Sequence, residues 1–429
     1  MRWCVAVLLA LVVAGCGSLG DGRTIVRMAD WSGAGDDSDF NKLVKQIYAE
    51  FEQKHPDLDL RIEGTPGDMQ AYVTKMLLSH VAHTAPDVMR IDASSAAIFI
   101  DNGVLMDLRP YIEDDPEVDL DDFFPNAVDI TRRGNAIYGL PMGFTPMVLY
   151  YNKRLFDEAG VAYPDGTWTF SDFLDAARRL TTNDVYGFEF ANWMAGWILF
   201  LWNNGGDVLS PEGTTAVGYF DSSECVEAVQ FIHDLVIVHK VSPTLSQTAA
   251  LGVDLFANGK AAMKIVGHWA IIGYQSSKHI SIAEIGVAPL PSNLDEPVTV
   301  MYESGLAIFK DAKHPDAGWA LIRHMLSYDV QTRYNASGIE VCALRAVAEE
   351  AADPVASRVK NRVVPAALEQ AFVAIIPSAR APWGAKVERY NLVEPIGEKM
   401  MDRVLRQGVS VKVALRDAAR EIDEELTKE

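Results

Sequence analysis

The sequence predicts an α/β fold with a parallel sheet that is covered by helices on both faces. Two features of the N-terminal third support this fold class. Short runs of alternating apolar residues predict strands, and longer runs with apolar residues three or four positions apart predict amphipathic helices. The two kinds of run follow one another in turn. Ligands of such sheets bind beyond the carboxyl ends of the strands, so we expect the binding site there.

The first strand, helix and strand are expected to form a βαβ unit. Residues 24–30 predict the first strand, and the alternating leucine and isoleucine residues over 58–62 predict the second. Asp39 is the expected N-cap of the helix between them, and His55-Pro56 is expected to end it. The apolar face of this helix carries Phe40, Leu43, Val44, Ile47 and Phe51.

Later segments continue these patterns. A second helix presents Met69, Tyr72, Val73, Met76 and Leu77 on one face, before a short strand near residues 87–91. Thr169-Phe170-Ser171-Asp172 is similar to a capping box and predicts the start of another helix. A terminal helix carries Val411, Leu415, Ala418, Ile422 and Leu426 as one stripe. Its acidic last turn opposes the helix dipole, so packing must hold it.

The N-terminus predicts export and a lipid anchor. A positive start precedes an apolar run over residues 5–14, which is too short to span a bilayer but long enough for a signal peptide. Val13-Ala14-Gly15-Cys16 resembles the lipobox of bacterial lipoproteins. The resemblance implies a signal peptide over residues 1–15, lipid on Cys16, a tether over residues 16–23, and a location on the cell membrane facing the periplasm or cell exterior. An ordinary secretory signal is the alternative.

Charge and motif content argue against several functions. A formal charge of −21 without a basic cluster disfavours nucleic-acid binding. Cys225 and Cys342 lack a metal-binding spacing, so we expect neither a metal nor another cofactor. We expect these two cysteines to be buried thiols, and a disulfide between them is the alternative. The common serine-hydrolase, zinc-protease and phosphate-loop motifs are missing, so we expect no enzyme. A pair of carboxylates for glycan cleavage depends on spatial proximity, and that alternative stays open.

Three stretches resemble the signatures of family 1 extracellular solute-binding proteins. They are Ile137-Tyr138-Gly139-Leu140-Pro141 with its continuation to Phe156, Phe256 to Met263 with Gly267-His268-Trp269, and Lys313 to Ile322. The resemblance implies a two-lobed, type II periplasmic-binding-protein-like fold with hinge strands. Lobe one would use residues 24–143 and 291–340, and lobe two residues 144–290 and 341–429. It also implies a monomer that captures a carbohydrate between the lobes and delivers it to an ABC permease.

A sugar cleft needs aromatic rings for the flat faces of the sugar, and acids or amides for its hydroxyls. The resemblance aligns Trp269 and Trp383 with aromatic residues that stack on ligand in relatives. Trp31 directly follows the first strand, so it is expected in the cleft or in the core. Trp193 and Trp197 share one helical face beside Asn192, and we expect one in the cleft and the other in the core.

Several polar residues complete the expected site. Asp92 lies at a strand end, and the resemblance places Phe144 and Thr145 at a hinge crossing and Tyr302, Glu303 and Ser304 in the cleft. Arg380 keeps phosphorylated polyols such as glycerol 3-phosphate open. Asp87 is expected to anchor a loop, and Trp319 to lie in the core. Residues 339–344 depart from the family pattern, so the third hinge crossing is expected to follow its own path.

Overall fold

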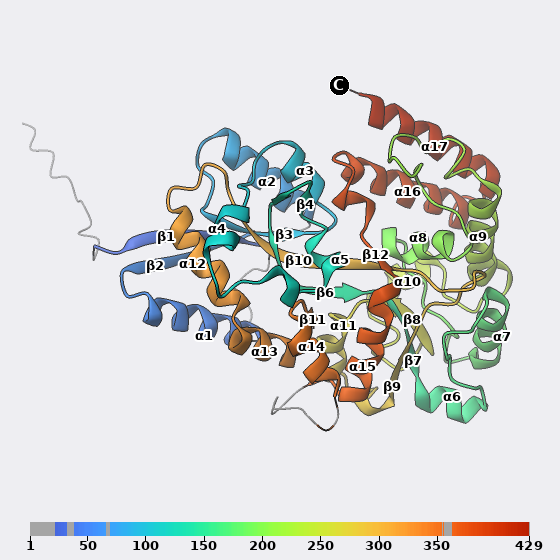
Figure 1. Ribbon diagram of the computed structural model, residues 1–429. Helices are drawn as coiled ribbons and strands as arrows, with labels where there is room; N and C mark the ends of the chain where they lie inside the picture. The colour runs from blue at the N-terminus through green and yellow to red at the C-terminus, as the bar shows by residue number, and fades with distance from the viewer. Residues whose placement is uncertain (1–21, 32–37, 66–68, 354, 356–362, 429) are drawn as a thin grey trace, which may run out of the picture.

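The structure is a computed structural model that describes residues 22–31, 38–65, 69–353, 355 and 363–428. Two α/β parts lie side by side, each with its own sheet and its own covering helices (Figure 1). The N-terminal strands belong to one part, and the last helices pack on the other. Among the described residues, no helix is long and apolar enough to cross a membrane. The predicted signal peptide and Cys16 lie outside the described residues.

The larger sheet has the strand order β11-β6-β10-β3-β1-β2. Its strands are β1 (Thr24–Asp30), β2 (Leu58–Gly64), β3 (Val88–Asp92), β6 (Leu140–Pro146), β10 (Thr299–Ile308) and β11 (Val341–Cys342), with β12 (Ala379–Arg380) beside β10. β1 pairs in parallel with β2 and β3, as expected. β10 runs antiparallel to both β3 and β6, so the expectation of an all-parallel sheet was wrong. Strands from distant parts of the chain enter this sheet. Their direction depends on the connections between those parts, and the local sequence pattern does not show it.

The smaller sheet has the order β8-β7-β9. It consists of β7 (Val148–Asn152), β8 (Met263–Val266) and β9 (Ile285–Ala288), all antiparallel to their neighbours. Only Met147 separates β6 from β7, so one extended segment passes from the first sheet into the second. β10 also reaches this crossing, because the backbone N–H of Met147 donates to Val300 O at 3.0 Å.

Helices cover both sheets (Figure 1). The first part carries α1 (Asp39–Lys54), α2 (Met69–Val81), α3 (Ala96–Asp101), α4 (Arg109–Asp114), α5 (Pro125–Val128), α12 (Pro315–Leu326) and α13 (Tyr328–Ala336). The rest of the helices are α6 (Lys153–Ala159), α7 (Phe170–Leu180), α8 (Met194–Trp202), α9 (Ser223–His233), α10 (Leu245–Leu251), α11 (Ala270–Gln275), α14 (Arg345–Ala352), α15 (Ala366–Ile375), α16 (Tyr390–Leu405) and α17 (Val411–Thr427). The short hairpin β4 (Arg132–Arg133) and β5 (Ala136–Ile137) leads into β6.

Local signals set most of the helix ends. Thr169 forms the capping box of α7 with Asp172, as predicted. α1 ends at His55, as predicted, but its N-cap is Ser38 and not Asp39. The Ser38 hydroxyl accepts from the backbone N–H of Asn41, and this leaves Asp39 in the first turn, where its charge favours the helix dipole. The terminal stripe on α17 is buried through Val411, Leu415, Ala418 and Ile422.

Several core expectations are confirmed. Trp319 is nearly buried, and its indole N–H donates to Asp115 Oδ2 at 2.9 Å. Cys225 and Cys342 are buried free thiols. Asp87 anchors two segments, because its carboxylate accepts from the backbone N–H groups of Arg27 and His314, each at 2.9 Å. These contacts join β1 and the start of α12 to the beginning of β3, at the opposite end of that strand from Asp92.

Candidate functional site

A cavity of about 200 Å³ lies where β3 and β10 run beside the crossing between the sheets. Many of the predicted site residues line it. The lining comprises Trp31, Phe40, Arg90, Asp92, Thr145, Trp269, Tyr302, Glu303, Ser304, Tyr334, Ile339 and Glu340. Strand pairing explains this gathering, since Ser304 is opposite Asp92 and Tyr302 is opposite Thr145. Paired residues project from the same face of a sheet, so four polar or aromatic side chains meet there. We call this space the crossing cavity.

Three aromatic rings cluster at the site: Trp269 and Tyr302 line the cavity, and Trp193 packs against both of them. Trp193 and Tyr302 are nearly parallel, with centroids 6.1 Å apart, and the Trp269 ring stands edge-on to both at 6.3 Å. All three side chains are half-buried. Rings that keep part of their surface exposed beside a cavity can accept the apolar face of a ligand.

Trp31, which also lines the cavity, lies beneath a buried cation. The Arg90 guanidinium lies 5.0 Å from the centroid of the Trp31 ring. Its nitrogens donate to the Tyr334 hydroxyl at 2.9 Å and to the Ser304 hydroxyl at 3.2 Å. Ser304 in turn donates to Glu340 Oε2 at 2.7 Å. These bonds fix the position of Arg90, although it lies inside the protein.

Carboxyl groups dominate the charge of the crossing cavity. Asp92, Glu303 and Glu340 line it, and burial raises the pKa of each. Asp92 accepts from the backbone and hydroxyl of Ser94, which opposes the effect of burial. For Glu303, the neighbouring charges of Asp92 and Glu340 raise the pKa further. Carboxyl groups that are poorly solvated and repel one another gain stability when a ligand donates hydrogen bonds to them.

Two glycines are needed for the walls of this site. A Cβ at Gly267 would overlap both the Trp269 ring and the Thr145 methyl group. A Cβ at Gly143 would overlap the Glu340 side chain. Gly143 and Gly267 therefore let functional side chains approach the backbone closely.

Comparisons with known proteins agree with this architecture. A profile described as bacterial extracellular solute-binding protein matches residues 31–332. The chain belongs to this family. Maltodextrin-binding protein MdxE of Bacillus subtilis is 22% identical over 404 residues, which cover 89% of this chain and 88% of the relative. A putative binding protein of Brucella abortus is 22% identical over 345 residues, covering 78% and 79% of the two chains.

Solved structures establish the fold of this solute-binding protein. An ABC substrate-binding protein of Listeria monocytogenes, solved with cycloalternan, superposes with a TM-score of 0.81 at 24% identity, covering 95% of this chain and all of that chain. A maltose-bound protein from T. maritima gives 0.76 at 23% identity, covering 93% and 99%. The predicted two-lobed, type II periplasmic-binding-protein-like fold is confirmed. We therefore call the two parts lobes.

Two residues predicted for the site of this solute-binding protein lie instead in the core. Phe144 has no exposed surface and packs edge-on against Phe124 of the α5 segment. Trp197 has none either, and its ring stacks on Phe220. Of the two tryptophans that share a helical face, Trp193 is therefore the one beside the cleft. Trp197 was ambiguous in the sequence, because an indole suits a core and a sugar platform equally well.

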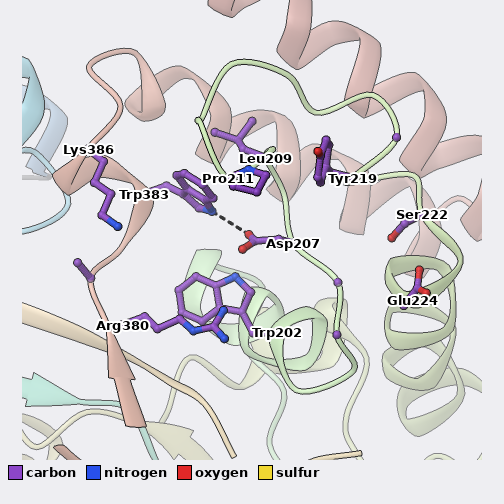
Figure 2. A pocket seen from close by; sticks show the side chains of 14 residues that line it. Trp202, Asp207, Leu209, Pro211, Tyr219, Ser222, Glu224, Arg380, Trp383 and Lys386 are labelled. Atoms are coloured by element: carbon purple, nitrogen blue, oxygen red, sulfur yellow. Dashed lines mark hydrogen bonds between the residues drawn. The ribbon is translucent and has the colours of Figure 1, made fainter. Parts of the chain in front are cut away.

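Asn192, Arg380 and Trp383 lie outside the lining of the crossing cavity. Asn192 donates to Glu398 O and Asp402 Oδ1 of α16, so its amide holds a helix in place. Arg380 and Trp383 line a larger cavity of about 720 Å³, together with Trp202 and Asp207 (Figure 2). Figure 2 shows the Trp383 indole N–H directed at Asp207, and the distance to Oδ1 is 2.8 Å.

Sequence reasoning missed Arg90, Tyr334, Glu340 and Glu394. Glu340 belongs to the segment that departs from the family pattern, which was the one available signal. Glu394 projects from α16 and interacts electrostatically with Asp92 and Tyr302. Burial first, and then the charges of Asp92 and Glu398, raise the pKa of Glu394 to about 7. Each of these residues is distant in sequence from the strand ends it faces, so no local motif could reveal it.

Proposed function

We propose that this solute-binding protein is the ligand-capturing subunit of an ABC importer and that its ligand is a mono- or oligosaccharide. The crossing cavity carries the proposal, because it combines half-buried indole and phenol rings with buried carboxyls and one guanidinium. Rings cover the C–H faces of a sugar, and the charged groups form strong hydrogen bonds with its hydroxyls. Two similar proteins, a maltodextrin-binding protein and a protein solved with cycloalternan, support the same class of ligand.

The division into lobes follows the crossing strands. We propose lobe one as residues 24–143 with 291–340, and lobe two as residues 144–290 with 341–429. The site would then combine Trp31, Asp92 and Tyr302 to Ser304 from lobe one with Thr145, Trp193 and Trp269 from lobe two. A ligand that contacts both lobes favours the closed form, because only that form makes all contacts at once. The monomeric closed form is then presented to the permease.

The charge of the site favours a sugar over a phosphorylated polyol. Arg90 is the cation that lines the crossing cavity, and it already donates to Tyr334 and Ser304. Arg380, which had kept the phosphate alternative open, lines the other cavity. A phosphate beside Asp92, Glu303 and Glu340 would meet strong repulsion.

A thermal-shift screen of mono- and oligosaccharides tests the proposed function. A ligand that binds only the folded protein stabilises it by about 2.7 kcal/mol at one hundred times its Kd. We expect one saccharide class to raise the Tm and to quench tryptophan fluorescence. No response across the panel would contradict the sugar assignment. Chromatography of the same saccharides after incubation tests the hydrolase alternative, and we expect intact sugar.

Attachment by lipid remains a proposal that rests on Cys16. We expect the full-length protein to incorporate labelled palmitate in a bacterial host and to fractionate with membranes, because Cys16 would carry the lipid. A Cys16→Ser variant should lose both properties, whereas a Cys225→Ser control should keep them. Membrane association of the Cys16→Ser variant would contradict the proposed anchor.

A further inference from the structure

We propose that the crossing cavity binds a positively charged ammonium group carried by the captured ligand, so that the ligand is an amino sugar or an oligosaccharide containing one. This inference rests on the proposed function and deepens it. It follows from three observations: the excess of carboxyls in the cavity, the lack of hydrogen-bond partners on two of them, and the arrangement of the rings.

Carboxyl groups outnumber cations in the lining. Asp92, Glu303 and Glu340 face one guanidinium, that of Arg90. Glu394 of α16 adds a fourth carboxyl within electrostatic reach of Asp92. Arg90 is also shared with Asp30, whose carboxylate lies 4.0 Å from Nη1. The single cation does not prevent these acids from raising one another's pKa, and a cationic ligand group would stabilise their ionised forms.

Two of these carboxyl groups have oxygen atoms without a hydrogen-bond partner among the described residues. Glu303 is 1% exposed, and neither of its carboxylate oxygens has a hydrogen-bond partner among the described residues. Glu340 is 8% exposed, and its Oε1 lacks a hydrogen-bond partner, with Arg90 Nη2 no closer than 3.9 Å. Buried acceptors without donors cost free energy, so a ligand that supplies N–H donors is favoured.

The rings beside these acids suit a cation. Trp269 and Tyr302 line the cavity, and Trp193 backs both of them. The faces of indole and phenol rings carry negative potential and attract ammonium groups. A neutral sugar hydroxyl gains from the carboxyls but little from the ring faces. An ammonium group gains from both the carboxyls and the ring faces.

Matched sugar pairs test this inference on the purified protein by calorimetry. The probes are glucose, galactose and mannose, the 2-amino derivative of each, and the N-acetylated derivative, which keeps the nitrogen but removes its charge. We expect at least one amine to bind about tenfold more tightly than its neutral and N-acetylated partners. Glu340→Gln keeps the shape and the Ser304 contact but removes a carboxylate, so it should abolish this preference. Glu296→Gln, on an exposed loop residue, should leave the preference unchanged.

The outcomes separate the two proposals. Binding of neutral sugars with no preference for any amine would overturn the ammonium site and leave the saccharide function standing. Retention of the amine preference in Glu340→Gln would also overturn it. If neither the probes nor the oligosaccharide panel binds, both proposals fail. Circular dichroism of each variant confirms that lost binding does not reflect lost structure.

Discussion

Trp269 and Trp197 have the same side chain in opposite environments. Trp269 is half-buried beside the crossing cavity, whereas Trp197 is fully buried against Phe220. We predict that Trp269→Ala weakens binding of the sugar found in the screen by about 1–3 kcal/mol, the range measured for aromatic stacking platforms. Unfolding in urea should change little. Calorimetry and denaturation of the same variant measure the two effects.

Trp197→Ala is the matched control for that experiment. Removing a buried indole leaves a void, and we expect a loss of about 3–5 kcal/mol in the free energy of unfolding. The variant that remains folded should bind the sugar with nearly unchanged affinity. If Trp269→Ala loses stability but keeps its affinity for the sugar, Trp269 has a structural role in the core and does not contact the ligand.

Glu394 makes stability depend on pH. Its pKa is raised from 4.5 to about 7, chiefly by burial. A carboxyl with a raised pKa favours the fold while it is protonated, so this contribution is complete below about pH 4.5 and is lost as the pH rises through about 7. We predict that Glu394→Gln, which stays neutral, unfolds at higher urea concentration than the wild type at about pH 8. The difference should be up to about 3 kcal/mol and should vanish near about pH 4.

Urea titrations of both proteins across this pH range measure the difference in the free energy of unfolding. Glu388→Gln provides a control on the same segment, because Glu388 is exposed. A constant difference between Glu394→Gln and wild type at every pH would show that the pKa of Glu394 is the same in the folded and unfolded states, and it would contradict the raised pKa.

At the scale of elements, the turn from β8 into α11 positions the principal indole. A Cβ at Gly267 would overlap the Trp269 ring and the Thr145 methyl group. We predict that Gly267→Ala weakens sugar binding by a similar amount to Trp269→Ala, because the ring must turn away. Gly273→Ala in α11 is the control, since a Cβ there meets no neighbour. Equal affinities of the two alanine variants would contradict this role.

The capping box of α7 offers a separate test of a helix end. Thr169 accepts from the backbone of Asp172, and Asp172 accepts from the backbone of Thr169 at 2.9 Å. We predict that Thr169→Ala lowers the free energy of unfolding by about 1 kcal/mol, as the loss of an N-cap generally does. Sugar affinity should not change, because α7 lies away from the crossing cavity. A combined loss of stability and affinity would indicate that α7 supports the site.

At the scale of the whole molecule, the two lobes touch around the cleft. Asn102 donates to Glu388 Oε1 at 2.7 Å, and Arg133 donates to Ala385 O at 2.6 Å. These contacts join the first lobe to the segment that leads into α16. A cleft that closes on its ligand should form or strengthen them.

We predict that a bound sugar decreases the radius of gyration measured by X-ray scattering. The physical reason is that ligand contacts from both lobes favour the closed form. Glu388→Ala removes the hydrogen bond from Asn102, so it should weaken sugar binding through closure without touching the cavity. An unchanged radius of gyration on binding would contradict lobe closure.

The sequence by itself determined the elements that depend on neighbours along the chain. The βαβ start, the end of α1 at His55, the capping box at Thr169 and the terminal helix were all predictable, because periodicity and capping act over three or four residues. The family resemblance added the two-lobed fold and several residues that line the crossing cavity.

Only the tertiary structure decided which residues meet. The antiparallel placement of β10, the burial of Phe144 and Trp197, and the approach of Arg90, Glu340 and Glu394 all depend on contacts between distant segments. Side-chain chemistry is identical in a core and in a cleft, so sequence patterns cannot distinguish them. Tertiary packing determines how much water and which neighbours each side chain contacts. It therefore determines which charged groups meet at the site.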